Sequence, residues 1–400
     1  MDGNSRKKTF LSGRCFEAIQ LLRKFKPDTR IIMPYTLRHT KTGTFFFLAM
    51  LCVWLTGCTN QEANGQTETY PKTVSRMDEF STTKKYTKFG DESIKVWNEK
   101  IPEVEQVEIT STYDGKKEPA LIYTSNTPKK KPLLVILHSW SSGYLQQASI
   151  PYALWAKKYD WVFLQPNYRG KFDHPESTGS EMAIQDIVDA VNFAKGNAEI
   201  DPSRIYVVGS SGGAMSALLV AARHPNIWAG VVAWVPIYDL ADWYTFNKQY
   251  PHRNYNNQLL SSICGEPLPG TKAGREAIRR SPSTYMHLAK DVPIFIAQGN
   301  IDPLVSPAHA VRAYNALADT ADQISGEQIM HLLVEKTTPP DLVTDNPDST
   351  FFGPKDPKVI FMKESGNVRL VMFEGVHDMA YNPTLLWLNQ QRKKLQENTQ

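Results

Sequence analysis

The chain has 400 residues, of which 41% are hydrophobic and 22% are charged. This composition is typical of a globular protein and excludes a largely disordered chain, which would combine low hydrophobicity with high charge. The net charge of +4 comes from residues 1–57, which hold ten basic and three acidic residues, so the remainder carries a net charge of −3. The basic excess belongs to one terminal segment and does not indicate nucleic-acid binding.

The first 57 residues have the layout of an export signal. Arg38 and Lys41 precede an apolar run at 45–55. This run is too short to span a bilayer, which takes about 20 residues, but it suits the apolar core of a signal peptide. A Leu-Thr-Gly-Cys sequence at 55–58 resembles the bacterial lipobox. We therefore expect a removed leader and a lipid anchor at Cys58, the alternative being a plain secretory signal.

The segments on either side of this signal have separate interpretations. Residues 1–32 precede a second methionine, Met33, and are interpreted as an over-long start. Lipidation of Cys58 would hold the mature protein to a membrane of the bacterial cell envelope, at the outer membrane or the periplasmic face. Residues 58–100 are rich in Thr, Lys, Gln, Asn and Ser, and we predict that they form a tether to a folded catalytic domain at 101–400.

Cysteine use agrees with this organisation. Cys264 is the single thiol that would remain after leader removal and lipidation, so we expect no internal disulfide. No Cys/His spacing resembles a zinc site, and we expect no metal ion in the domain.

From residue 101 onward, the hydrophobic pattern predicts an α/β fold. Residues 104–109 alternate in polarity, and 120–123 are expected to pair with them as a hairpin. Short apolar runs, typical of parallel strands buried on both faces, then alternate with helical patterns at 184–194 and 214–223. These runs are 133–137, 161–164, 205–208, 230–234, 292–297 and 368–373. We expect one domain with a doubly wound, mainly parallel sheet.

Two long stretches interrupt this alternation. Residues 235–290 are predicted to form a cap or lid insertion, and 336–358 are rich in Pro and Asp. Stretches of this length are usually functional or mobile when they carry no regular structure. The aromatic side chains at 235–255 could stack on sugar or aryl rings of a substrate, or they could pack the core of the insertion.

The strongest motif is a G-x-S-x-G sequence at 209–213, which lies between the apolar run 205–208 and a helix of small residues. A turn this tight requires glycines on both sides of the serine, so that strand and helix can approach closely. It leaves Ser211 at a helix N-terminus, where the dipole and free N–H groups favour negative charge. We predict Ser211 as a nucleophile, because the rival Ser210 is out of register with the glycines.

A serine nucleophile needs a base, which follows the last strand in this arrangement, and an acid, which follows the strand before it. His377 comes directly after the run 368–373 and is the predicted base. Asp302 follows the preceding strand and would hold the imidazole in the correct tautomer. Two rival acids fit less well, because Asp378 adjoins His377 in sequence and Asp291 precedes its strand.

An attacked carbonyl develops negative charge, which two backbone N–H groups of an oxyanion hole can stabilise. One of these groups is expected from Gly212. The second is expected from the loop after 133–137, where we predict Trp140 as the donor and Ser139 as the alternative. His138 begins this loop and is expected to order it rather than to catalyse.

Residues 118–395 resemble the catalytic domain of the prolyl oligopeptidase (S9) group of α/β-hydrolases and its esterase relatives. The resemblance rests on 138–143, Asn167-Tyr168-Arg169-Gly170, 209–213, Ser281-Pro282, 299–302 and Gly375-Val376-His377. It implies that Ser211, Asp302 and His377 are a catalytic triad and that no cofactor is required. The loop has His-Ser-Trp where the group often has His-Gly-Gly, which leaves the oxyanion donors open.

The resemblance also bears on the reaction. The peptidases carry a large β-propeller before the hydrolase domain, whereas about forty-five tether residues and a hairpin stand in that place here. Propeller-less relatives include esterases that act on acylated carbohydrates. We therefore predict a carboxylesterase that acts on an acylated oligosaccharide or a similar extracytoplasmic ester. The alternatives are a serine peptidase that releases short peptides and a lipoprotein that uses the fold only as a binding scaffold.

Overall fold

The computed structural model describes residues 74–80, 92–343 and 351–395, which belong to one compact unit of the chain, Thr69–Gln400. The leader and Cys58 lie outside the described residues, so the lipid anchor stays a prediction. Within the described ranges, no helix is both long and apolar enough to cross a membrane.

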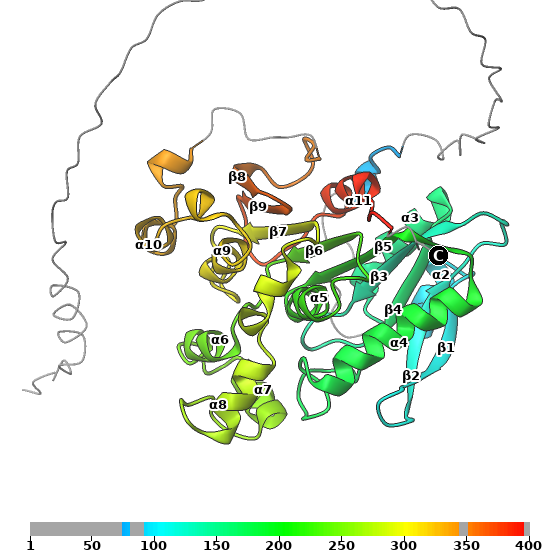
Figure 1. Cartoon of the computed structure of the whole chain (residues 1–400), viewed down its shortest axis with the longest axis horizontal. Helices are drawn as coiled ribbons and strands as arrows, with labels where there is room; N and C mark the ends of the chain where they lie inside the picture. Colours follow the sequence, from blue (N-terminus) through cyan, green and yellow to red (C-terminus); the bar gives the residue numbers. More distant parts are fainter. Residues whose placement is uncertain (1–73, 81–91, 344–350, 396–400) are drawn as a thin grey trace, which may run out of the picture. The chain divides into compact units, whose positions relative to one another are not determined.

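A nine-stranded sheet forms the centre of this unit (Figure 1). Its strands are β1 (Glu105–Thr110), β2 (Lys117–Tyr123), β3 (Lys131–Leu137), β4 (Val162–Pro166), β5 (Ile200–Ser210), β6 (Gly230–Trp234), β7 (Ile294–Gly299), β8 (Val359–Ser365) and β9 (Val368–Phe373). They are ordered β1-β2-β4-β3-β5-β6-β7-β9-β8. All pairings from β4 to β9 are parallel, whereas β1, β2 and β8 pair antiparallel at the two edges. The predicted α/β fold with a mainly parallel sheet is confirmed.

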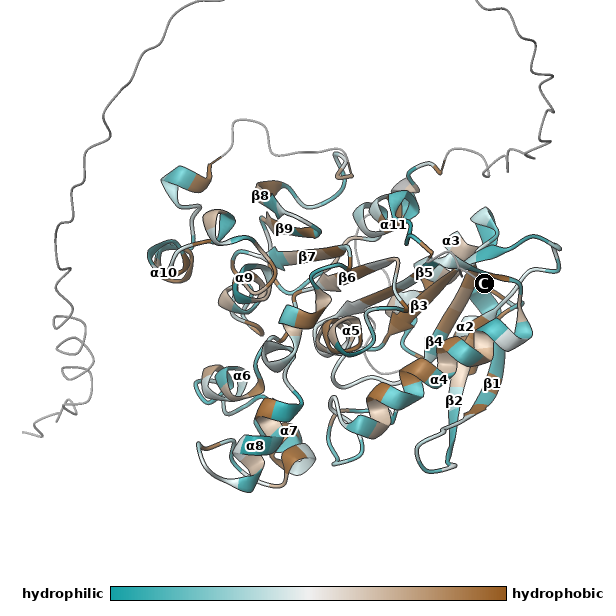
Figure 2. Ribbon diagram, viewed as in Figure 1, coloured by the Kyte–Doolittle hydropathy of each residue, from teal (hydrophilic) through white to brown (hydrophobic). Residues whose placement is uncertain are grey.

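Helices cover both faces of the sheet. They are α2 (Ile94–Lys100), α3 (Ile150–Tyr159), α4 (Glu181–Asn197), α5 (Gly212–Arg223), α6 (Leu240–Asn247), α7 (Tyr255–Ile263), α8 (Lys272–Arg279), α9 (Ala308–Asn315), α10 (Gly326–Val334) and α11 (Tyr381–Gln390). Along β5, Ile205 and Val207 contact the core that includes α4, α5 and α9. Tyr206 and Val208 contact the core of α2, α3 and α11. The strands are correspondingly rich in hydrophobic residues (Figure 2).

The stretch 235–290 lies between β6 and β7 and forms helices α6, α7 and α8, followed by two short 3-10 turns, Pro282–Thr284 and Met286–Ala289. In Figure 1 the three helices form a group at the lower left of the view. The predicted insertion is thus helical rather than an irregular loop.

The second edge of the sheet differs from the sequence prediction. β8 pairs antiparallel with β9 through a two-residue connection, Gly366 and Asn367. Gly366 has φ of +54°, the left-handed conformation that such tight hairpins require and that glycine adopts without steric cost. A Gly-Asn pair between two apolar runs is a hairpin signal, so this strand could have been found from the sequence.

Part of the predicted tether is folded against the domain. Trp97 on α2 is fully buried, its ring centroid lies 5.7 Å from that of Phe163, and its Nε1 donates to the carbonyl oxygen of Leu145 at 3.0 Å. Met77 and Asn382 exchange two hydrogen bonds of 2.8 and 3.0 Å between backbone and amide groups. The folded domain therefore begins before residue 101, because these segments bury apolar surface on the sheet and on α11.

Replacing Trp97 with Ala should lower the free energy of unfolding by about 3–5 kcal/mol, because a fully buried ring is exchanged for a cavity. Guanidinium unfolding followed by circular dichroism measures the change. Glu99→Ala, on the exposed side of the same helix, is the matched control and should stay within about 0.5 kcal/mol of the parent. Equal effects of the two substitutions would show that α2 is not part of the folded unit.

Candidate active site

Ser211 stands in a strained turn between strand and helix. β5 ends immediately before it and α5 begins immediately after it. Its backbone has φ 59° and ψ −121°, and its N–H donates to the carbonyl oxygen of Trp234 at 2.9 Å. A Cβ at Gly209 would lie 2.1 Å from the carbonyl oxygen of Gly213, so a side chain there would clash with the backbone of α5. The sequence pattern around Ser211 therefore forms the predicted turn.

The carboxyl ends of neighbouring parallel strands bring the three predicted residues to one edge of the sheet. β5 pairs with β6, β6 with β7, and β7 with β9. Ser211 follows β5, Asp302 follows β7, and His377 follows β9. Backbone hydrogen bonds continue past the strand ends, because Asn300 N–H donates to Phe373 at 3.0 Å. The loops that carry Asp302 and His377 thus run side by side.

Asp302 and His377 are hydrogen bonded. Nδ1 of His377 lies 2.7 Å from Oδ2 of Asp302, whose side chain is fully buried. The same oxygen accepts from Nε2 of Gln298 at 3.0 Å, and Oδ1 accepts from the N–H groups of Leu304 and Val305 at 2.8 and 3.0 Å. These bonds fix the carboxylate. Because the carboxylate holds the proton on Nδ1, Nε2 is the basic nitrogen of a neutral His377 ring.

The rival residues are differently placed. Asp378 accepts a hydrogen bond from the N–H of Met379 at 2.8 Å. Asp291 is exposed at the opposite end of β7 from His377. Ser210 is the last residue of β5, where it pairs with Trp234. The carboxylate of Asp302 contacts His377, as predicted for the acid.

The loop after β3 lies against the serine turn. A Cβ at Gly212 would lie 2.9 Å from the backbone nitrogen of Trp140, so the two backbones are in direct contact. The N–H of Ser139 donates to Oε1 of Gln146 at 2.7 Å and is engaged within its own loop. Between the two alternatives for the second oxyanion donor, this geometry favours Trp140.

His138 orders this loop. The residue is fully buried, and its Nδ1 and Nε2 lie 3.0 and 2.8 Å from the carbonyl oxygens of Ser139 and Asn167. Its ring stacks on that of Tyr168, with centroids 4.2 Å apart. Burial lowers the pKa of His138 and outweighs the two carbonyl oxygens, which raise it.

A row of aromatic rings connects the serine turn to the acid loop. The rings of Phe172 and Trp140 lie 5.2 Å apart, those of Trp140 and Trp243 4.4 Å, and those of Trp243 and Tyr255 5.5 Å. Nε1 of Trp243 donates to the carbonyl oxygen of Leu304 at 3.0 Å. Trp243 is buried, so it packs the base of the insertion, which is one of the two roles considered for these aromatics.

Two supporting residues were missed from the sequence. Gln298, at the end of β7, is a fully buried amide that donates a hydrogen bond to Asp302. The sequence pattern that could have identified it is a polar residue at the end of an apolar run. His309 on α9 is buried, and its Nδ1 accepts from the N–H of Tyr238 at 3.1 Å. Burial lowers the pKa of His309 to about 4.

Among the described residues, no group of three His, Cys, Asp or Glu side chains could hold a metal ion.

His309 predicts a pH dependence of stability. Its folded pKa of about 4 lies below the ordinary value of 6.5, so the unfolded state binds a proton more tightly at intermediate pH. The contribution of His309 is complete above about pH 6.5 and is lost as the pH falls toward 4. We expect about 2 kcal/mol of destabilisation from this residue between pH 7 and pH 5.

The measurement is urea unfolding at both pH values for the parent, His309→Gln, and His252→Gln as an exposed control. His309→Gln should flatten the pH dependence, while His252→Gln should keep that of the parent. An unchanged pH dependence in His309→Gln would contradict a buried neutral ring.

The prolyl oligopeptidase family model matches residues 153–332, a stretch that contains Ser211 and Asp302 and ends before His377. The chain is 28% identical over 128 residues to acetylxylan esterase A of Emericella nidulans, covering 29% of this chain and 41% of that protein. It is 27% identical over 118 residues to poly(3-hydroxyalkanoate) depolymerase C of Paucimonas lemoignei, covering 26% of this chain and 28% of that protein. The chain thus spans less than half the length of these curated relatives.

Two solved structures are also similar. One is an acylaminoacyl peptidase of Pyrococcus horikoshii, with a TM-score of 0.45 and 15% identity over 68% of this chain and 37% of that chain. The other is a thermostable esterase, with a TM-score of 0.41 and 15% identity over 73% of this chain and 64% of that chain. Over residues 153–332 the chain is similar to the prolyl oligopeptidase family, and the strand order and the turn at Ser211 give the described domain an α/β-hydrolase fold.

Proposed function

We propose that the domain is a serine hydrolase with Ser211 as nucleophile, His377 as base and Asp302 as the acid that orients the base. The proposal rests on one observation. The 2.7 Å hydrogen bond between Asp302 and Nδ1 of His377 lies at the edge of the sheet where Ser211 stands in its strained turn. A buried, fixed carboxylate keeps the ring in the tautomer that can accept a proton from serine and stabilises the imidazolium that forms.

In the proposed reaction, Nε2 of His377 takes the proton of Ser211 while Oγ bonds to the substrate carbonyl carbon. The N–H groups of Gly212 and Trp140 stabilise the oxyanion. The bond to the leaving group then breaks, and His377 gives its proton to the departing oxygen or nitrogen. Water attacks the acyl-enzyme with His377 again as base, which releases the acid and restores Ser211.

Esters are the proposed substrates, in particular acylated carbohydrates in the cell envelope, where a lipid anchor at Cys58 would hold the enzyme. The names of the two curated relatives, an acetylxylan esterase and a poly(3-hydroxyalkanoate) depolymerase, support this choice. The family match supports peptide hydrolysis as the second candidate.

Replacing Ser211 with Ala should lower kcat on p-nitrophenyl acetate by roughly 10⁶, because the covalent path is lost. It should also abolish labelling by a fluorophosphonate probe. Ser210→Ala is the matched control, since it changes the neighbouring hydroxyl, and it should keep both activity and labelling. Labelling that survives in Ser211→Ala but disappears in Ser210→Ala would show that Ser210, not Ser211, is the nucleophile.

Ester and amide substrates separate the two candidate functions. We expect turnover of p-nitrophenyl acetate and of acetylated xylo-oligosaccharides at rates at least tenfold above those on aminoacyl-p-nitroanilides. Initial rates at equal substrate concentration, with Ser211→Ala as the blank, measure the ratio. Faster cleavage of the anilides would show that the protein is a peptidase rather than an esterase. No reaction with either class and no labelling would favour a binding protein.

A further inference from the structure

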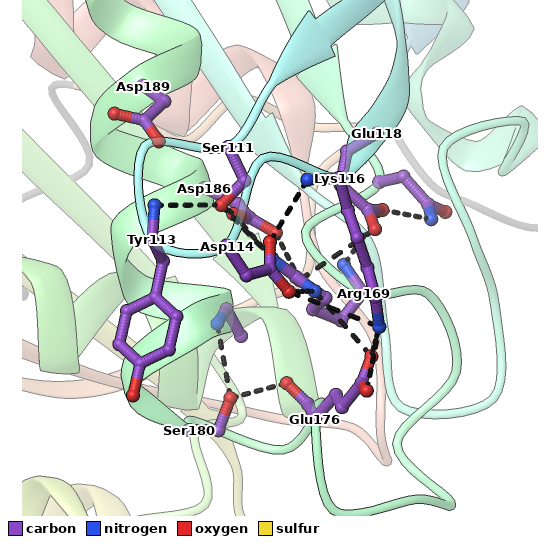
Figure 3. Close-up of polar contacts among 12 residues, drawn as sticks. Ser111, Tyr113, Asp114, Lys116, Glu118, Arg169, Glu176, Ser180, Asp186 and Asp189 are labelled. Carbon is purple, nitrogen blue, oxygen red and sulfur yellow. Dashed lines mark hydrogen bonds and ion pairs between the residues drawn. The ribbon is translucent and has the colours of Figure 1, made fainter.

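Arg169 is a buried cation held by carboxylates from several parts of the chain (Figure 3). Its side chain is 1% exposed. Both terminal nitrogens donate to Asp114 at 2.8 and 2.9 Å, and Nε donates to Asp186 at 2.6 Å. Oxygens of Glu118 and Glu176 lie 3.7 and 3.5 Å from the guanidinium. A buried charge is tolerated only with such partners, because leaving it unpaired is strongly unfavourable.

The partners come from separate elements. Asp114 lies in the turn between β1 and β2, Glu118 on β2, Glu176 in the loop before α4, and Asp186 on α4. The hydrogen bond from Arg169 holds the pKa of Asp114 well below its usual range, whereas burial raises the pKa of Asp186. The guanidinium therefore joins the edge hairpin, the loop and the helix at one point.

The backbone at this point is strained. Tyr168, Arg169 and Gly170 have φ values of 32°, 76° and 64° in succession. A left-handed conformation costs on the order of 1–3 kcal/mol for each non-glycine residue and persists only where surrounding contacts impose it. The ion pairs of Arg169 are among the contacts that can impose it, together with the hydrogen bonds from the N–H groups of Arg169 and Gly170 to Glu118 and Asn167.

The strained turn holds the loop that carries the proposed oxyanion donor. The hydroxyl of Tyr168 donates to the carbonyl oxygen of His138 at 2.7 Å. The N–H of Phe172 donates to the carbonyl oxygen of Trp140 at 2.9 Å. The ring of Phe172 also lies against Gly212, since a Cβ there would be 3.1 Å from Cε2 of Phe172. Movement of this turn would thus move the Trp140 amide relative to the serine turn.

We propose that Arg169 is a positioning residue for the oxyanion hole. Its ion pairs hold the turn at 168–170 in the conformation that places the N–H of Trp140 beside Gly212. This inference rests on the proposed function of Ser211. It predicts that loss of the guanidinium fork weakens stabilisation of the tetrahedral intermediate more than binding of the substrate, because substrate carbonyls carry less negative charge than the oxyanion.

The test compares Arg169→Met and Arg169→Lys in the full chain. Arg204→Met is the matched control, because Arg204 is also buried and its Nε donates to Asp201 at 2.6 Å. Arg204 lies six residues before the end of β5, about 20 Å from the serine turn. Asp114→Asn is a milder variant that alters one partner and keeps the cation, for the case in which Arg169→Met fails to fold.

The readouts are kcat and KM on p-nitrophenyl acetate and the inhibition constant of phenylboronic acid, measured well below each variant's Tm. The tetrahedral boronate on serine places an oxygen in the oxyanion hole. We expect Arg169→Met to lower kcat by about 10–100-fold, with KM changed less than about threefold and boronate binding weakened in step with kcat. Arg169→Lys and Asp114→Asn should lie between Arg169→Met and the parent, because Lys lacks the bidentate fork.

Arg204→Met should lower Tm and leave kcat and boronate binding within about twofold of the parent. The inference is overturned if Arg169→Met behaves like Arg204→Met, or if boronate binding is unchanged while kcat falls. Failure of the proposed function gives a different result, since the parent protein itself would then show no activity, no labelling and no boronate binding that depends on Ser211.

Discussion

The close approach of α5 to the ends of β3 and β5 is the constraint on which the rest of the site depends. It forces Ser211 into φ 59° and ψ −121° and admits only glycine at position 209, where a Cβ would overlap the helix backbone. The same approach sets Gly212 against the amide of Trp140. One packing contact between a helix and two strand ends thus fixes the proposed nucleophile and both proposed oxyanion donors relative to one another.

Two separate supports flank this contact. On the acid side, Gln298 and two backbone N–H groups fix the carboxylate of Asp302, and Trp243 of the insertion bonds the same loop. On the oxyanion side, the ion pairs of Arg169 anchor the turn that holds His138 and Trp140. The insertion is therefore bonded to the acid loop through Trp243, and the edge hairpin is bonded to the oxyanion side through Arg169.

The sequence predicted the parallel strands, because runs such as 205–208 are buried on both faces and must be apolar throughout. It also predicted that Ser211, Asp302 and His377 follow the ends of parallel strands, where the structure places them, and their catalytic roles are a proposal. It missed what depends on partners distant in sequence. The strained φ at Tyr168 and the neutral state of His309 follow from tertiary contacts that no local pattern encodes. The burial of Trp97 was missed because the helix around it is short and mostly polar.

The strand order has a consequence for the order of events during synthesis. β9 lies between β7 and β8 although it is the last strand of the chain, and Met77 bonds Asn382, 305 residues away. Contacts of such long sequence separation form late, because the intervening chain must be ordered first. A nascent chain that stops before β9 would hold the strained serine turn without His377, the residue proposed to activate it. The proposed triad is therefore complete only when translation has passed residue 377.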